Sequence, residues 1–131
     1  LLIRSVLNGT VMKIFGNDYD TSDGTCIRDY VHVLDIAKAH VQALNYLEQG
    51  RETISLNLGT GTGHSNLEVI HAIEKLTQKI VPHTFAERRA GDPAVLVSTS
   101  DKAKKVLNWQ PQYNLTDILT HAWQWHKKEN L

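Results

Sequence analysis

The chain has 131 residues, of which 41% are hydrophobic and 21% are charged, so it can bury the core of about one globular domain. Its 14 basic residues balance its 14 acidic residues, which argues against a nucleic-acid binder or a membrane-surface binder, because both usually carry a basic excess. The absence of a long apolar run predicts no membrane segment, and the single cysteine, Cys26, excludes an internal disulfide and fits a cytoplasmic location.

The chain opens with a predicted helix. Apolar residues within 2–7 lie on one helical face, and Gly9 is a typical stop. No capping residue and no initiator Met precede this pattern, so we expect a fragment that begins inside a helix. Residues 11–15 are then predicted to form a strand, and residues 16–24 a polar loop.

The next elements are a second strand, a helix and a third strand. β-branched alternation predicts a short strand or an extended segment over residues 30–33, after which Asp35 is expected to cap a helix that ends at Gly50. Residues 53–58 alternate as a strand. The glycine-rich residues 59–64 follow a strand and precede a helix, but His64 takes the place of the third glycine of a dinucleotide-binding loop, so a structural turn is favoured.

The remaining elements carry clear capping signals. Ser65 and Glu68 form a predicted capping box, and Asn114 with Asp117 resembles one before the last helix. A further strand is predicted over residues 80–85 and a short helix over residues 101–107. Trp123 is expected in the core.

Two arginine motifs are candidates for binding phosphate. Arg88 and Arg89 lie beside a flexible glycine, and planar guanidinium groups match phosphate oxygens; a solvated surface loop is the alternative. Arg28 follows the polar loop and is either a second phosphate ligand or the partner of a local ion pair. His32 is of interest because of this setting, whereas the seven histidines show no metal-ligand spacing and Cys26 is expected to be a bystander.

The run from Phe15 to Asp35, FGNDYDTSDGTCIRDYVHVLD, resembles the UDP-glucose 4-epimerases, a family of extended short-chain dehydrogenase/reductases. The resemblance continues through residues 57–61, 88–93 and 107–109 and covers essentially the whole chain, always as the C-terminal part of the enzyme. It implies that residues 1–131 form a small mixed α/β substrate-binding domain that lacks the N-terminal Rossmann domain.

The resemblance also implies site residues. The expected contacts are uracil at the strand of Lys13, Ile14 and Phe15, the diphosphate at Arg28 and Arg89, and the ribose at Asp92. Leu96 stands where some members have a Tyr that contacts the nucleotide, so it is left out of the predicted site.

In this family the N-terminal domain binds NAD and supplies a Tyr-x-x-x-Lys pair, and neither that pair nor an intact glycine fingerprint occurs here. The resemblance therefore implies that the full enzyme interconverts UDP-glucose and UDP-galactose through a 4-keto intermediate, whereas this chain binds substrate, has no catalytic, cofactor or metal residues and is inactive alone. Its partners would be the UDP-sugar and the missing domain, with self-association through exposed apolar surface. The alternatives are another nucleotide-sugar epimerase or dehydratase, or a non-catalytic nucleotide- or protein-binding module.

Overall fold

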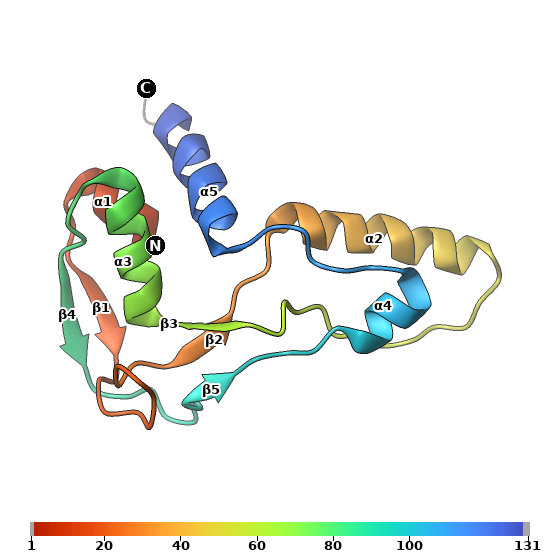
Figure 1. Ribbon diagram of the computed structural model, residues 1–131, viewed down its shortest axis with the longest axis horizontal. Coiled ribbons are helices and arrows are strands. Elements are labelled where there is room, and N and C mark those ends of the chain that lie inside the picture. Colours follow the sequence, from red (N-terminus) through yellow and green to blue (C-terminus); the bar gives the residue numbers. More distant parts are fainter. Residues whose placement is uncertain (1, 130–131) are drawn as a thin grey trace.

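The computed structural model describes residues 2–129, in which two packed groups of elements flank a small central sheet (Figure 1). In chain order, the elements of the described chain are α1 (Leu2–Asn8), β1 (Met12–Phe15), β2 (Ile27–Asp29), α2 (Val33–Glu48), β3 (Gly63–Ser65), α3 (Asn66–Thr77), β4 (His83–Ala86), β5 (Val95–Leu96), α4 (Asp101–Leu107) and α5 (Leu115–Glu129). The expected small mixed α/β fold is therefore confirmed.

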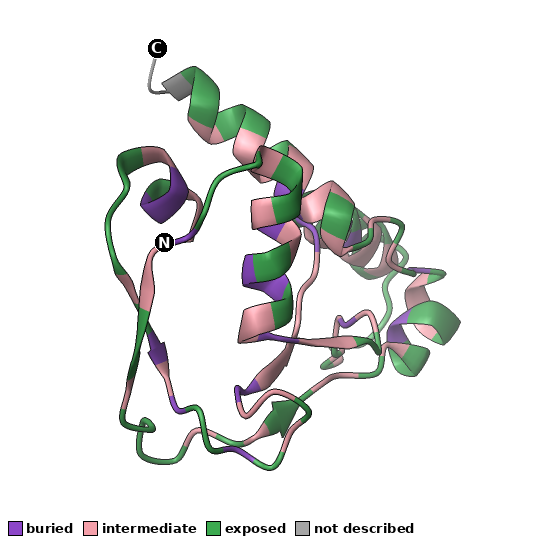
Figure 2. Ribbon diagram, turned by 60° about the vertical axis from the view of Figure 1, so that its left-hand side comes forward, coloured by how far each residue is buried: buried purple, intermediate pink, exposed green. Residues whose placement is uncertain are grey.

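The larger core lies between the parallel pair β1–β4 and the helices α1, α3 and α5. Helix α3 presents buried residues at the spacing of one helical face, and Ile70 and Ile73 are 1% and 0% exposed. Figure 2 shows how buried and exposed positions are distributed over the helices and strands around this core. The buried members of this core are Val6, Ile14, Val69, Ile70, Ile73, Val81 and Leu119.

A second, smaller core joins α2 to α4 around Trp109. This side chain is 0% exposed and packs with Ala39 and Ala103, whose small side chains leave room for the indole ring. Its Nε1–H donates to the backbone oxygen of Asp35 at 2.7 Å, so the polar end of the ring is also satisfied.

The central sheet has the order β3–β2–β5 and connects the two groups. Strand β2 pairs antiparallel with β3 and parallel with β5, which sets Arg28 opposite His64 on one side and Leu96 on the other. This register fixes the position of Arg28 within the sheet.

Several local predictions are confirmed. Ser65 and Glu68 form the reciprocal capping box of α3, and Asn114 and Asp117 exchange backbone-to-side-chain bonds of 3.0 Å before α5. Gly9 ends α1 with a φ of +65°, a conformation that glycine adopts without strain. No helix in the described part of the chain is long and apolar enough to cross a membrane.

The predicted strand over residues 30–33 is wrong. The extended segment lies three residues earlier, as β2, where β3 and β5 supply pairing partners. Helix α2 then begins at Val33 and is capped by His32, whose Nδ1 accepts from the Leu34 N–H at 3.0 Å. Asp35 is not the cap: its buried carboxylate accepts instead from backbone N–H groups in the segment that leads to α5.

Other boundaries also differ. Residues 53–58 are not a strand, because no neighbouring strand among the described residues pairs with them, although their burial alternates as expected. The turn predicted over residues 59–64 ends in β3, and β4 begins at His83 rather than at residue 80. Trp123 is only half-buried at the edge of the core.

Candidate functional site

A cavity of about 370 Å³ opens between β1, β2, α3 and the loop that follows β4. Its volume lies within the usual range of small-molecule sites. It brings together six residues from three separate stretches of sequence that the sequence interpretation assigned to the substrate: Lys13, Ile14, Phe15, Arg28, Arg89 and Asp92.

Arg28 is held firmly at one wall of this cavity. Its Nη2 donates to Asp92 Oδ1 at 2.5 Å and to the Pro93 carbonyl at 2.9 Å, and its Nη1 donates to the Ile27 carbonyl at 2.6 Å. The side chains of Arg28 and Asp92 are 21% and 29% exposed, so the pair is partly desolvated. Arg28 donates these hydrogen bonds from Nη1 and Nη2, and its Nε–H has no hydrogen-bond acceptor among the described residues.

Arg89 and Phe15 form a second wall. The guanidinium carbon of Arg89 lies 3.9 Å from the centroid of the Phe15 ring, a stacked cation–π contact. Phe15 ends β1, and Arg89 lies just beyond the end of β4, so the parallel pairing of these strands brings the two side chains together. Arg89 and Phe15 therefore contribute a cation–π pair to the lining of a basic cavity.

Seven residues that line the cavity were not assigned to the site from the sequence. Tyr30, Cys26 and Asn66 carry polar groups, and the others are Leu2, Met12, Val69 and Ile70. Burial raises the pKa of Tyr30, so its hydroxyl stays protonated. The Nδ2 of Asn66 donates to the Cys26 sulfur at 3.2 Å, which makes this buried thiol part of the wall rather than a free surface group. Cys26 and Tyr30 flank β2, and Asn66 follows β3 directly, so the pairing of β2 with β3 brings these residues together. No spacing in the sequence indicates this pairing.

Asp29 supports the site from outside the cavity. Its carboxylate accepts from the N–H groups of Thr60, Gly61 and Ser98 at 3.0–3.2 Å, and from the Thr60 hydroxyl at 2.5 Å. Burial alone would raise the pKa of Asp29, but these hydrogen bonds outweigh it and hold the pKa below its usual value. The predicted structural turn at the glycine-rich segment is thus organised by a carboxylate.

This arrangement leaves no dinucleotide site in the glycine-rich segment. The backbone N–H groups that would cradle a pyrophosphate, those of Thr60 and Gly61, already bind Asp29. A Cβ on Gly59 would also lie 2.7 Å from the Asp29 carboxylate. The glycine-rich segment therefore does not fit NAD, and the described residues contain no group of three or more metal-ligating side chains that could hold an ion.

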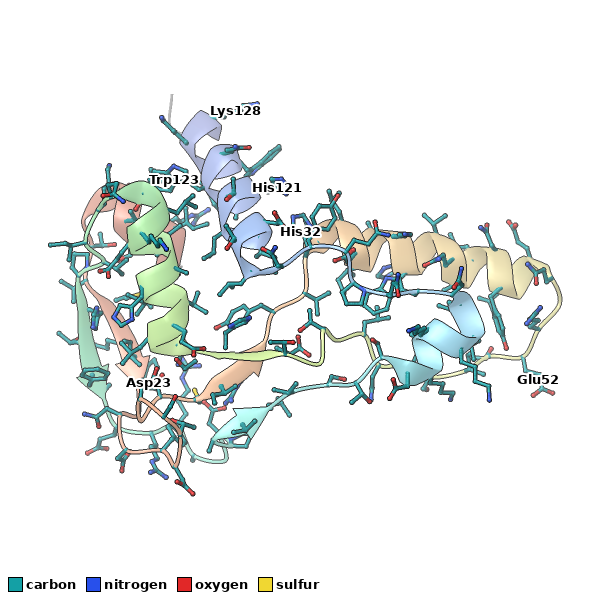
Figure 3. All side chains as sticks on the ribbon, in the orientation of Figure 1. Asp23, His32, Glu52, His121, Trp123 and Lys128 are labelled. Atoms are coloured by element: carbon teal, nitrogen blue, oxygen red, sulfur yellow. The ribbon has the colours of Figure 1, made fainter. Side chains whose placement is uncertain are left out.

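His32 has a structural role. It is 3% exposed and stacks on Tyr113, with ring centroids 4.2 Å apart. Because its Nδ1 accepts from the Leu34 N–H, its Nε2 carries the proton and donates to His121 Nδ1 at 2.9 Å. Figure 3 shows His32 and His121 at the junction of α2 and α5, away from the cavity.

Comparisons with known proteins agree with this geometry. The chain is 54% identical over 118 residues to a UDP-glucose 4-epimerase of Rhizobium meliloti, a match that covers 90% of the chain and 36% of that protein. The structure matches a UDP-glucose 4-epimerase of Stenotrophomonas maltophila, solved with bound NAD and formylated UDP-arabinopyranose, with a TM-score of 0.92 and 42% identity over 98% of the chain and 39% of that protein. It also matches the Bifidobacterium longum enzyme in complex with NAD+ and UDP, with a TM-score of 0.88 and 34% identity over 98% of the chain and 38% of that protein.

These matches confirm the resemblance to UDP-glucose 4-epimerases, and the chain spans little more than a third of the length of the relatives that it matches. The profile of the family described as GDP-mannose 4,6 dehydratase matches residues 2–122. Because this match covers nearly the whole sequence, the chain belongs to that family.

Proposed function

We propose that this chain is the UDP-sugar-binding, C-terminal part of a UDP-glucose 4-epimerase, which interconverts UDP-glucose and UDP-galactose. The observation that carries the proposal is the cavity, where all six residues expected at the substrate line one space. The identity to UDP-glucose 4-epimerases supports the same substrate class.

The nucleobase would lie against β1 and Phe15. Strand β1 pairs only with β4 within the described residues, so its other edge presents backbone N–H and C=O groups. Uracil carries one N–H donor between two carbonyl acceptors, which suits hydrogen bonding to a strand edge. The ring of Phe15 would provide an apolar face beside it.

The diphosphate would lie between Arg28 and Arg89. The cavity is lined by three basic side chains, Lys13, Arg28 and Arg89, and one acidic side chain, Asp92. The resulting excess of two positive charges matches the two negative charges of a nucleotide diphosphate ester. Charge-assisted hydrogen bonds from strand β2 and from the loop after β4 would also set the position of the sugar relative to the rest of the enzyme.

We propose that NAD and the catalytic pair belong to a part of the protein outside this chain, since the glycine-rich segment does not fit the cofactor and the sequence contains no Tyr-x-x-x-Lys pair. That part would dock against the apolar residues left exposed on α2, including Val41, Leu44 and Leu47, which are 58%, 61% and 48% exposed. Residues 53–58, whose Leu56 and Leu58 pack against the core of Trp109, would be covered by the same partner. We also propose a cytoplasmic location, with which the single, unpaired Cys26 is compatible.

The test uses the protein at its full natural length. We expect Arg28→Ala and Arg89→Ala each to weaken UDP binding by tens-fold, or about 1.5–3 kcal/mol, because each removes a charge-assisted bond to the diphosphate. Isothermal titration calorimetry measures this change. Arg51→Ala is a matched control, since Arg51 also lies over an aromatic ring, that of Tyr46, but away from the cavity. Unchanged affinity in both cavity variants contradicts the proposal.

Measurement of enzymatic turnover distinguishes the proposed epimerase from the alternative functions. The intact protein should epimerise UDP-glucose in preference to UDP-glucuronic acid, and preference for another nucleotide sugar would indicate a different epimerase or a dehydratase. UDP binding without turnover by the natural full-length protein would indicate a non-catalytic module.

A further inference from the structure

The two consecutive arginines after β4 do different things. Arg89 stacks on Phe15 inside the cavity, whereas Arg88 turns away from the cavity and contacts the loop of residues 16–25. Its guanidinium carbon lies 4.3 Å from the centroid of the buried Tyr19 ring. The loop of residues 16–25 and the segment that bears the arginines lie together at the lower left of Figure 1.

Arg88 holds this loop at two further points. Its Nε donates to Asp18 Oδ1 at 2.7 Å, and its Nη2 donates to the backbone oxygen of Asp18. These bonds hold the pKa of Asp18 below its usual value and raise that of Arg88. The Arg88 side chain also passes close to Gly16, where an added Cβ would lie 3.0 Å from Arg88 Cγ. Arg88 thus spans the loop from Gly16 to Tyr19.

These contacts define the position of Arg88 but contribute little to the stability of the fold. The side chains of Arg88 and Asp18 are 47% and 69% exposed, and exposed ion pairs contribute little to folding. A guanidinium with two hydrogen bonds and a ring beneath it nevertheless has one defined position. Because Arg89 is the next residue, the fixed position of Arg88 also fixes the backbone from which the Arg89 side chain extends to the cavity.

We propose that Arg88 is a positioning residue for the UDP-sugar site: together with Asp18 and Tyr19 it fixes the loop so that Arg89 lies over Phe15 and faces the diphosphate. The inference rests on the proposed function, because it assigns Arg88 a role through the anion that Arg89 binds. Arg88 itself does not touch the substrate.

The test separates positioning from simple attraction of an anion by charge. UDP affinity is measured by calorimetry on the natural full-length protein and on Arg88→Ala and Asp18→Ala. Removing the carboxylate of Asp18 takes a negative charge away from the neighbourhood of the diphosphate, so a purely electrostatic role predicts tighter binding in Asp18→Ala. Positioning predicts weaker binding in both variants, by about 5- to 10-fold for Arg88→Ala and about 3-fold for Asp18→Ala.

A double-mutant cycle identifies the residue through which Arg88 acts. In an Arg89→Ala background, Arg88→Ala should change the affinity by less than about 2-fold, because the side chain that it positions is gone. Equal effects in both backgrounds, or Asp18→Ala binding as tightly as the wild type or more tightly, overturn the inference. If the wild type does not bind UDP, or if Arg89→Ala binds as the wild type does, the proposed function itself fails. Arg51→Ala again serves as the control and should bind as the wild type does.

Discussion

Asp29 is predicted to be a principal stabilising carboxylate of the central sheet. In Asp29→Ala, the N–H groups of Thr60, Gly61 and Ser98 lose a charged acceptor that lies 3.0–3.2 Å away. A hydrogen bond to a charged group contributes about 1.5–3 kcal/mol when buried, and because this site is partly open to water we expect a total loss of about 3–5 kcal/mol. In Asp29→Asn, the amide oxygen can keep the three N–H bonds while the Thr60 hydroxyl reverses, so the expected loss is about 1–2 kcal/mol.

Urea unfolding followed by tryptophan fluorescence measures both free energies, since Trp109 is fully buried in the folded chain. Asp20→Ala is the control, because Asp20 is exposed and no hydrogen bond or ion pair involves it among the described residues. A loss below about 1 kcal/mol in Asp29→Ala, or equal losses in the Ala and Asn variants, would refute the reasoning, because the charge and the acceptor geometry would then not account for the stability.

Three further outcomes are expected. The pKa of Asp23 is lowered because hydrogen bonds from Ser65 and Thr25 outweigh the effect of burial. The stabilisation that Asp23 contributes is therefore present above the unfolded pKa of about 3.8 and is lost as the pH falls through the lower folded pKa. In acid titration, the stability of Asp23→Asn should fall less steeply below about pH 4 than that of the wild type. Trp109→Phe removes the donor to the Asp35 oxygen and should cost about 1–3 kcal/mol in urea unfolding, and an unchanged midpoint would contradict that. The isolated 131-residue chain should self-associate through the apolar face of α2, and light scattering should show that Leu44→Glu reduces the association; a monomeric isolated chain argues against this surface.

The capping elements show what short-range sequence can predict. The box of Ser65 and Glu68 and the pair Asn114 and Asp117 form between residues three positions apart, so their spacing alone predicts their hydrogen bonds. Strand β1 was also predicted from a short local run, residues 11–15, and forms over Met12–Phe15.

The predictions are wrong where a residue that is distant in the sequence determines the local structure. Asp35 has the chemistry of a helix cap, but the neighbourhood of Gln112 and Tyr113 recruits its carboxylate, and His32 takes over the capping. Residues 53–58 have the alternation of a strand, but pairing requires a neighbouring strand that the described chain does not supply. Local propensity is thus overridden by tertiary contacts.

The sequence by itself was enough to select the residues that we propose to bind the substrate. Arg28, Arg89, Asp92 and the β1 residues were identified from the motif and its resemblance, because guanidinium groups and a strand edge suit a nucleotide diphosphate wherever they are placed. Only the tertiary structure decided that these residues line one cavity and that adjacent arginines diverge, with Arg89 over Phe15 and Arg88 over Tyr19. The physical reason is that the direction of a side chain depends on its packing partners, and the partners of Arg88 and Arg89 lie about 70 residues away in the sequence, at the same end of a parallel strand pair.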